Sequence, residues 1–186
     1  MKIELVIFLI LLKILLILSE IPSIKSKYYN KIDVITNDLK NEINKYNVIS
    51  FDIFDTLLVR PYVKPTDVFE HLEKLNNATG FTKARIKAET ESWSKRGGTF
   101  DGIYEFIDQE YKWLKEKELS LEYNSVTGRS LVKNIYEYSI KQNKTVIVIS
   151  DMYFSKQVLI NMLKKCGYLN IEKLYVSSEY GKTKWS

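Results

Sequence analysis

The stretch SFDIFDTLLVRP, residues 50–61, places two aspartates three positions apart at the end of an apolar run. Residues 47–52, NVISFD, form a short β-branched run, which predicts a buried strand that ends at Asp52. A carboxylate at the end of a buried strand, followed by a turn rich in backbone amides, can attack phosphorus or carbon as a nucleophile. The stretch therefore indicates both a core strand and a candidate catalytic residue.

Two further apolar runs predict buried strands later in the chain, at residues 144–150 (KTVIVIS) and 173–178 (KLYVSS). The intervening segments carry apolar residues at helical spacing, with Thr66 and Ser155 as candidate N-caps and Gly167 as a stop signal. The helices expected from these patterns span residues 32–46, 66–77, 81–96, 100–114, 130–143 and 155–167.

Strands that alternate with helices predict right-handed crossovers and an α/β fold with a parallel sheet. In such sheets the chemistry lies beyond the carboxyl ends of the strands. Asp52, Ser150 and the pair Ser177-Ser178 fall at those ends, and the lysine-bearing stretch 178–186 follows the third strand. The sequence therefore predicts an arrangement of Asp, Ser and Lys around one anionic group.

The segments VISFDIFDTLLVRP (48–61), VIVISDMY (146–153) and VSSEYGKTK (176–184) resemble, in order, three signatures of the haloacid dehalogenase (HAD) superfamily. The resemblance covers roughly Asp33 to the end of the chain. The combination of the three segments looks like that of a bacterial group of HAD-like hydrolases often encountered with surface-polysaccharide and glycosyltransferase genes. It implies a Rossmann-like parallel sheet built from residues 32–61 and 128–186, with an inserted α-helical cap at residues 62–127.

The resemblance implies a hydrolase that uses an aspartate nucleophile and Mg²⁺ on a phosphorylated or other anionic small molecule. Asp52 would be the nucleophile and a magnesium ligand, and the backbone carbonyl of Phe54 would be a second ligand. Lys184 would orient the nucleophile and the phosphate. Lys182 is a possible substitute for Lys184 in that role, because the loop spacing does not separate the two lysines.

Substrate binding is expected from four further residues. By the same resemblance, Thr56 would hold the phosphate-facing turn and Ser150 would bind the phosphate. Arg60, just beyond the nucleophile turn, and Arg85, within the expected cap, are candidates to grip an anionic substrate. Either arginine could instead be paired with a carboxylate of the protein.

The sequence departs from the superfamily pattern in two places. Phe54 occupies the position where phosphatases of the superfamily carry a general acid and base, and Asp55 is the neighbouring acid that could replace it. The fourth signature, an acidic strand that completes the magnesium site beside the first strand, is absent before Ser186, so we expect a truncated core whose first strand lies at an edge. The alternative to a hydrolase is a catalytically impaired remnant that acts as a binding module.

The composition restricts the partners and the cofactors. The formal net charge of the 186 residues is +5, but the lysines are scattered among glutamates, which favours anionic small molecules over nucleic acid as partners. Cys166 is the only cysteine and His71 is the only histidine, so a cysteine cluster or a multi-histidine metal site is excluded.

The N-terminal 31 residues form an apolar segment followed by a basic linker. Residues 5–18 are apolar except for Lys13, which makes the run short for a membrane-spanning helix. A membrane anchor, a signal peptide and an interfacial helix all remain open. If the segment inserts, the lysines that follow it would keep the rest of the chain in the cytoplasm.

Overall fold

The computed structural model describes residues 36–96 and 98–184, which form two compact units. The sheet unit comprises the described residues up to Val59, Gly128–Ile149 and Gly167–Leu174. The helical unit comprises Arg60–Thr127, Ser150–Cys166 and the chain from Tyr175 onward. The helical unit thus contains the whole insertion expected at residues 62–127, together with three segments that the sequence assigns to the core: residues 60–61, 150–166 and the described chain from 175 onward.

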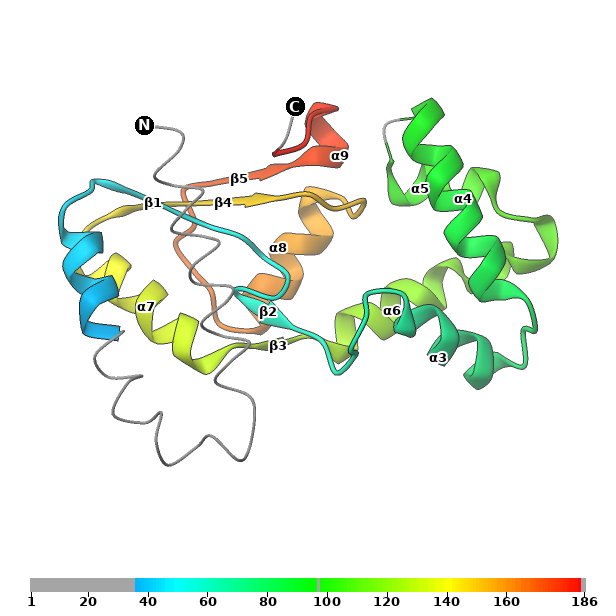
Figure 1. The fold of residues 1–186 in the computed structure, drawn as a ribbon, viewed down its shortest axis with the longest axis horizontal. Helices are drawn as coiled ribbons and strands as arrows, with labels where there is room; N and C mark the ends of the chain where they lie inside the picture. The colour runs from blue at the N-terminus through cyan, green and yellow to red at the C-terminus, as the bar shows by residue number, and fades with distance from the viewer. Residues whose placement is uncertain (1–35, 97, 185–186) are drawn as a thin grey trace. The chain divides into compact units, whose positions relative to one another are not determined.

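The architecture is α/β with a small parallel sheet, as the sequence predicts (Figure 1). The strands β1 (Val48–Phe51), β4 (Thr145–Ser150) and β5 (Lys173–Val176) lie in the order β1-β4-β5. β1 pairs with β4 in parallel, with Phe51 opposite Val148. β1 therefore forms one edge of the described sheet, at the position that the sequence predicts for it.

Strands β1 and β4 carry buried side chains, most of them β-branched or aromatic, and Phe51 of β1 packs against helix α7 (Ser130–Lys141). The rings of Phe51 on β1 and Tyr136 on α7 lie 5.7 Å apart. Tyr136 also meets Tyr168 edge-on at 5.1 Å. These rings connect the sheet, α7 and the segment before β5 into one apolar layer.

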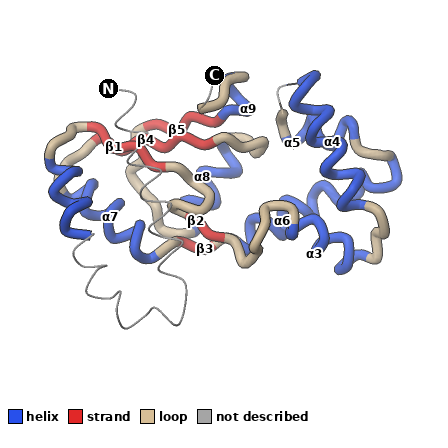
Figure 2. Tube along the Cα trace, viewed as in Figure 1, coloured by secondary structure: helices blue, strands red, loops and turns tan. Residues whose placement is uncertain are grey.

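The helical unit contains α3 (Asp67–Asn76), α4 (Phe81–Arg96), α5 (Phe100–Phe106) and α6 (Lys115–Ser125), which Figure 2 shows. The 3₁₀-helix η2 (Gln109–Leu114) lies between α5 and α6 in the chain. The sequence predicts one continuous helix over residues 100–114, and this prediction is wrong. Ile107 and Asp108 are extended, with ψ of 148° and 141°, and they separate α5 from η2. The Ile107 side chain is buried at the break, so core packing outweighs helix continuation there.

Three other elements lie outside the expectations. Helix α6 is missing from the sequence prediction because its fully buried side chains are Glu118 and Glu122, which apolar periodicity does not register. The two-residue strands β2 (Leu58–Val59) and β3 (Thr127–Gly128) pair with each other and are too short to show a pattern.

The last elements follow the sequence closely. Helix α8 (Lys156–Lys165) begins after Ser155, whose side chain accepts a hydrogen bond from the Val158 N–H as an N-cap. Strand β5 ends at Val176, and the short helix α9 (Ser177–Tyr180) replaces the two terminal strand residues that the sequence predicts. Thr66 lies at the N-cap position of α3, but its side chain makes no capping hydrogen bond.

Within residues 36–96 and 98–184, no helix has both the length and the apolar character needed to cross a membrane. The apolar run at residues 5–18 lies outside the described residues.

Candidate functional site

The chain that follows β1 forms a tight turn closed by its own backbone. The Leu58 N–H donates to the Ile53 carbonyl oxygen at 2.8 Å, and the Thr56 N–H donates to the same oxygen at 3.3 Å. The Asp55 N–H donates to the Leu58 carbonyl oxygen at 2.8 Å. Because Ile53, Leu57 and Leu58 are fully buried, this turn is anchored on both sides directly after Asp52.

The turn presents its two acids differently. Asp52 is half-buried at the strand end, whereas Asp55 is exposed and adopts a left-handed backbone with φ of 58°. Aspartate is among the few residues besides glycine that tolerate this conformation. Phe54 lies between the acids, half-buried, and forms an isolated bridge with Leu58, while the Thr56 side chain is buried. Both candidate catalytic carboxylates thus come from one short turn of the sheet unit.

The donor set of this turn suits a hard cation only in part. The described residues contain no group of three or more His, Cys, Asp or Glu that could hold a metal ion. Mg²⁺, however, is commonly bound through one or two carboxylates, several waters and substrate oxygens. The Asp52 carboxylate and the Phe54 carbonyl, separated by one residue of a fixed turn, match that smaller requirement.

A second candidate region lies in the helical unit, around the loop that follows β4. Ser150 is buried, and the next residue, Asp151, accepts the Lys184 backbone N–H on both carboxylate oxygens at 3.1 and 3.2 Å. The Ser177 hydroxyl accepts the Met152 N–H at 3.0 Å. The structure therefore brings the Lys184 backbone to the loop that begins at Ser150.

Arg85 is fully buried within the helical unit. Its guanidinium forms a two-pronged ion pair with Glu118, with contacts of 2.8–3.0 Å, and its Nη1 donates to Glu89 at 2.8 Å. The rings of Phe69 and Tyr153 flank the guanidinium carbon at 4.4 and 4.8 Å. In this arrangement Arg85 neutralises a buried carboxylate of the protein.

The electrostatics of Arg85 reflect this enclosure. Burial is the largest single influence and acts to lower the pKa of Arg85, but Glu118, Tyr153 and Glu89 together outweigh burial, so the net pKa is raised. The Tyr104 hydroxyl donates to Oε2 of Glu118 at 2.6 Å, an oxygen that also accepts from Arg85 Nε, and burial raises the pKa of Tyr104. Three donor groups of Arg85 and Tyr104 thus surround the Glu118 side chain.

Arg60, the other predicted substrate-gripping arginine, is also paired. Its Nη1 donates to Oε1 of Glu122 at 3.2 Å. Glu118 and Glu122 lie one turn apart on α6, and sequence reasoning missed both. The available signal was composition: four arginines stand among 24 lysines, and arginine is the residue preferred for buried ion pairs.

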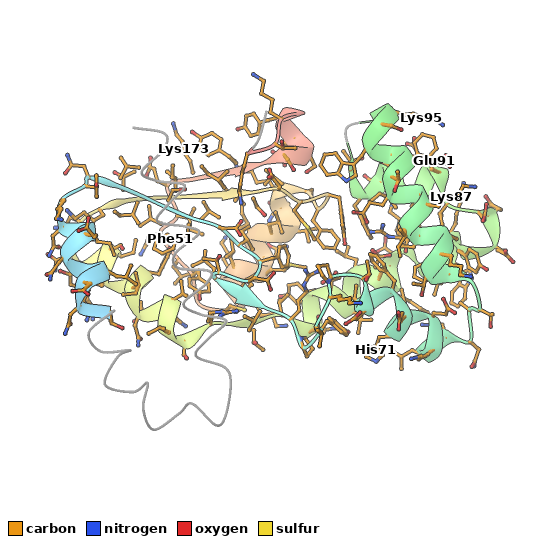
Figure 3. All side chains as sticks on the ribbon, in the orientation of Figure 1. Phe51, His71, Lys87, Glu91, Lys95 and Lys173 are labelled. Atoms are coloured by element: carbon orange, nitrogen blue, oxygen red, sulfur yellow. The ribbon has the colours of Figure 1, made fainter. Side chains whose placement is uncertain are left out.

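The outer face of α4 carries exposed ion pairs in place of a basic stripe. Figure 3 shows Lys87, Glu91 and Lys95 following one another along the helix, and both lysines pair with Glu91 at 3.9 and 3.7 Å. On α3, His71 is exposed and hydrogen-bonds the Tyr62 hydroxyl through Nδ1 at 2.8 Å. These contacts have the character of a solvated surface.

No protein-family model matches this sequence, and no curated protein sequence matches it. The likeness to the HAD superfamily therefore rests on the three motifs quoted from the sequence.

Proposed function

We propose that this protein is a HAD-like hydrolase that acts on a phosphorylated or other anionic small molecule, with Asp52 as the nucleophile. The observation that carries the proposal is the position of Asp52, directly after a buried strand of a parallel sheet and before a turn closed by three backbone hydrogen bonds. Such a turn holds a carboxylate in a fixed place at the end of the sheet where α/β proteins bind ligands.

The register of the sheet supports the role of Ser150. Phe51 and Val148 are partners, so β1 and β4 run in parallel toward the same edge, and Ser150 is the last residue of β4. We expect its hydroxyl to donate to a phosphoryl oxygen. Lys184 is the favoured lysine, because its backbone is bound to Asp151, and its ammonium group would neutralise charge on the same phosphoryl group.

In the proposed reaction an Asp52 carboxylate oxygen bonds to phosphorus while the bond from phosphorus to the leaving oxygen breaks. The leaving oxygen departs with the electron pair and needs a proton when it is an alkoxide, and Asp55 is the acid in the turn that could supply it. Water then cleaves the acyl phosphate and restores the Asp52 carboxylate. Mg²⁺, held by Asp52 and the Phe54 carbonyl, would offset the negative charge of the phosphoryl oxygens.

Thr56 and the two arginines complete the proposed substrate contacts. Thr56 would stabilise the turn that faces the phosphate. Arg60 and Arg85 already bind Glu122 and Glu118, so an anionic substrate would reach either guanidinium only if the ion pair opened. The proposal therefore rests chiefly on Asp52, Ser150 and Lys184.

The second candidate function is a binding module without turnover. Phe54 favours it, because an aromatic side chain cannot donate the proton that an alkyl phosphate requires. This module would bind the same anionic ligands and would leave them intact.

The test is turnover of a panel of phosphate esters by the purified chain with Mg²⁺, compared with the Asp52→Asn variant. We expect Asp52→Asn to abolish turnover, and Asp101→Asn, an exposed aspartate of α5, to leave turnover unchanged. Borohydride reduction during turnover should convert the acyl phosphate at position 52 to an alcohol that mass spectrometry detects. Undiminished turnover in Asp52→Asn would overturn the proposal, and ligand binding without turnover in the parent would establish the binding module.

A further inference from the structure

The ion pair between Arg60 and Glu122 connects the two ends of the helical insertion, which we call its base. Arg60 is the first residue of the helical unit, directly before the insertion at residues 62–127, and Glu122 lies near the end of α6, shortly before the insertion ends at Thr127. The two residues are 62 positions apart in the sequence, yet Arg60 Nη1 lies 3.2 Å from Glu122 Oε1. The contact therefore holds the entry and the exit of the insertion together.

The ion pair satisfies only one of the two carboxyl oxygens of Glu122. The Glu122 side chain has no exposed surface and that of Arg60 is 9% exposed. Within the described residues, Oε2 of Glu122 has no hydrogen-bond partner. A buried carboxylate with one unsatisfied oxygen carries a large desolvation cost, which a proton on that oxygen removes.

The charged and titratable groups that act on Glu122 come from its own helix and from three other parts of the chain: the segment after β2, α4 and the loop after β4. Burial is the largest influence on Glu122 and raises its pKa; Arg60 opposes this, and Glu118 on the same helix adds to it, so the pKa lies at about 7. Arg85 on α4 also acts to lower the pKa. The two remaining titratable groups in electrostatic contact with Glu122 are Tyr62, after Arg60, and Tyr153, in the loop after β4.

We propose that Glu122 is a proton-controlled clasp: the base of the insertion closes with the uptake of one proton by Glu122 and opens with its release. No bond other than the carboxyl O–H forms or breaks. In the closed state Oε2 of Glu122 carries the proton. Oε1 is then the carbonyl oxygen of the carboxylic acid, and it still accepts the hydrogen bond from Arg60. The clasp does not depend on the hydrolase proposal, since it concerns the helical unit alone.

The direction of the pH effect follows from the two states of Glu122. In the closed state its pKa is raised to about 7, and on opening the carboxyl reaches water and returns toward its ordinary value of 4.5. The closed state therefore holds more protons between these values, so rising pH favours opening. The opening equilibrium constant should increase by roughly tenfold per pH unit across this window and level off above it.

The first test is a titration of the glutamate carboxyl carbons of the intact chain by ¹³C NMR between pH 4 and 9. Glu122→Gln identifies the Glu122 signal, and Glu116→Gln, an exposed position on the same helix, is the matched control. We expect the Glu122 midpoint near pH 7. A midpoint in the ordinary range of an exposed glutamate would overturn the proposal, and this measurement on the parent chain needs no variant to fold.

The second test is the protection factor of the Val126 amide, which donates to the Glu122 carbonyl oxygen at 3.3 Å where α6 ends. Corrected for intrinsic exchange, protection should fall as the pH rises from 5 to 7 in the parent and stay flat in Glu122→Gln. Because Arg60 lowers the pKa of Glu122, Arg60→Met should move the midpoint to higher pH. A pH-independent protection factor in the parent, or an unmoved midpoint in Arg60→Met, would contradict the clasp.

Discussion

The Tyr168 hydroxyl donates a hydrogen bond of 2.7 Å to the carbonyl oxygen of Leu57, across 111 positions of the sequence. Both residues are buried in the sheet unit. Leu57 belongs to the turn that follows Asp52, and the same carbonyl oxygen accepts the Arg129 N–H at 3.0 Å. The turn that carries the proposed nucleophile is thus held from two distant parts of the chain.

We expect Tyr168→Phe to lower the free energy of unfolding by about 1 kcal/mol, the typical contribution of one hydrogen bond. The effect should stay near this value, because Arg129 continues to satisfy the Leu57 oxygen. Urea denaturation measures it, and Tyr180→Phe, at an exposed tyrosine of α9, is the control. Equal stability of the two variants would show that the Tyr168 bond does not support the turn.

Arg85→Met should lower the free energy of unfolding by about 3–5 kcal/mol, because it leaves the buried Glu118 carboxylate without its guanidinium partner. Lys83→Met, at an exposed position of the same helix, should change stability little. A deficit that matches Lys83→Met would contradict the role of Arg85 as the neutralising group of the helical unit.

Adding Glu118→Leu to Arg85→Met tests the pair directly. We expect the double variant to be more stable than the sum of the two single changes predicts, because no charge then remains unpaired between the two positions. The matching measurement is a double-mutant cycle by chemical denaturation. Strict additivity would indicate that the two side chains act independently.

The left-handed backbone of Asp55 should determine which substitutions at this position preserve the stability of the protein. Asp55→Gly and Asp55→Asn fit a φ of 58°, whereas the β-branched side chain of Asp55→Val should cost about 1–2 kcal/mol of stability. Thermal or urea unfolding of the three variants checks the order. If Asp55→Val is as stable as Asp55→Gly, the turn does not hold this conformation in solution.

The strands and most helices could be predicted because local patterns specify them. The β-branched runs before Asp52 and Ser150 became β1 and β4, and Ser155 caps α8 as the sequence indicates. In these elements the local propensity and the tertiary packing favour the same structure. The strand-end position of Asp52 could therefore be found without coordinates.

The interior of the helical unit could not be predicted, because its centre is charged. Glu118 and Glu122 occupy the buried positions of α6 that apolar residues usually fill, and their partners lie 33 and 62 positions away. Such pairs satisfy each other only once the chain has folded, so no local pattern reveals them. For the same reason the sequence left open whether Arg60 and Arg85 bind an anionic substrate or a carboxylate of the protein, and it named neither glutamate as a partner.

The last prediction concerns Phe54, the residue between the two acids of the turn. Phe54 is half-buried beside Leu58 and cannot donate a proton. If no other group supplies that proton, turnover should depend steeply on the acidity of the leaving group, so that aryl and acyl phosphates are cleaved far better than sugar phosphates. The measurement is kcat/KM across aryl and alkyl phosphates.

Phe54→Asp should then raise kcat/KM on alkyl phosphates by up to about 10²–10⁴-fold, the usual contribution of general acid catalysis, with the largest gains for the poorest leaving groups. Phe54→Asn is the matched control, because it has nearly the same shape as the aspartate and carries no acidic proton. The competing hypothesis assigns the proton to Asp55 and predicts little gain from Phe54→Asp, with a loss on alkyl substrates alone in Asp55→Asn. Two results together would favour Asp55 as the proton donor: kcat/KM in the parent that does not depend on the acidity of the leaving group, and the selective loss on alkyl phosphates in Asp55→Asn. They would contradict the hypothesis that the leaving group departs without a proton donor.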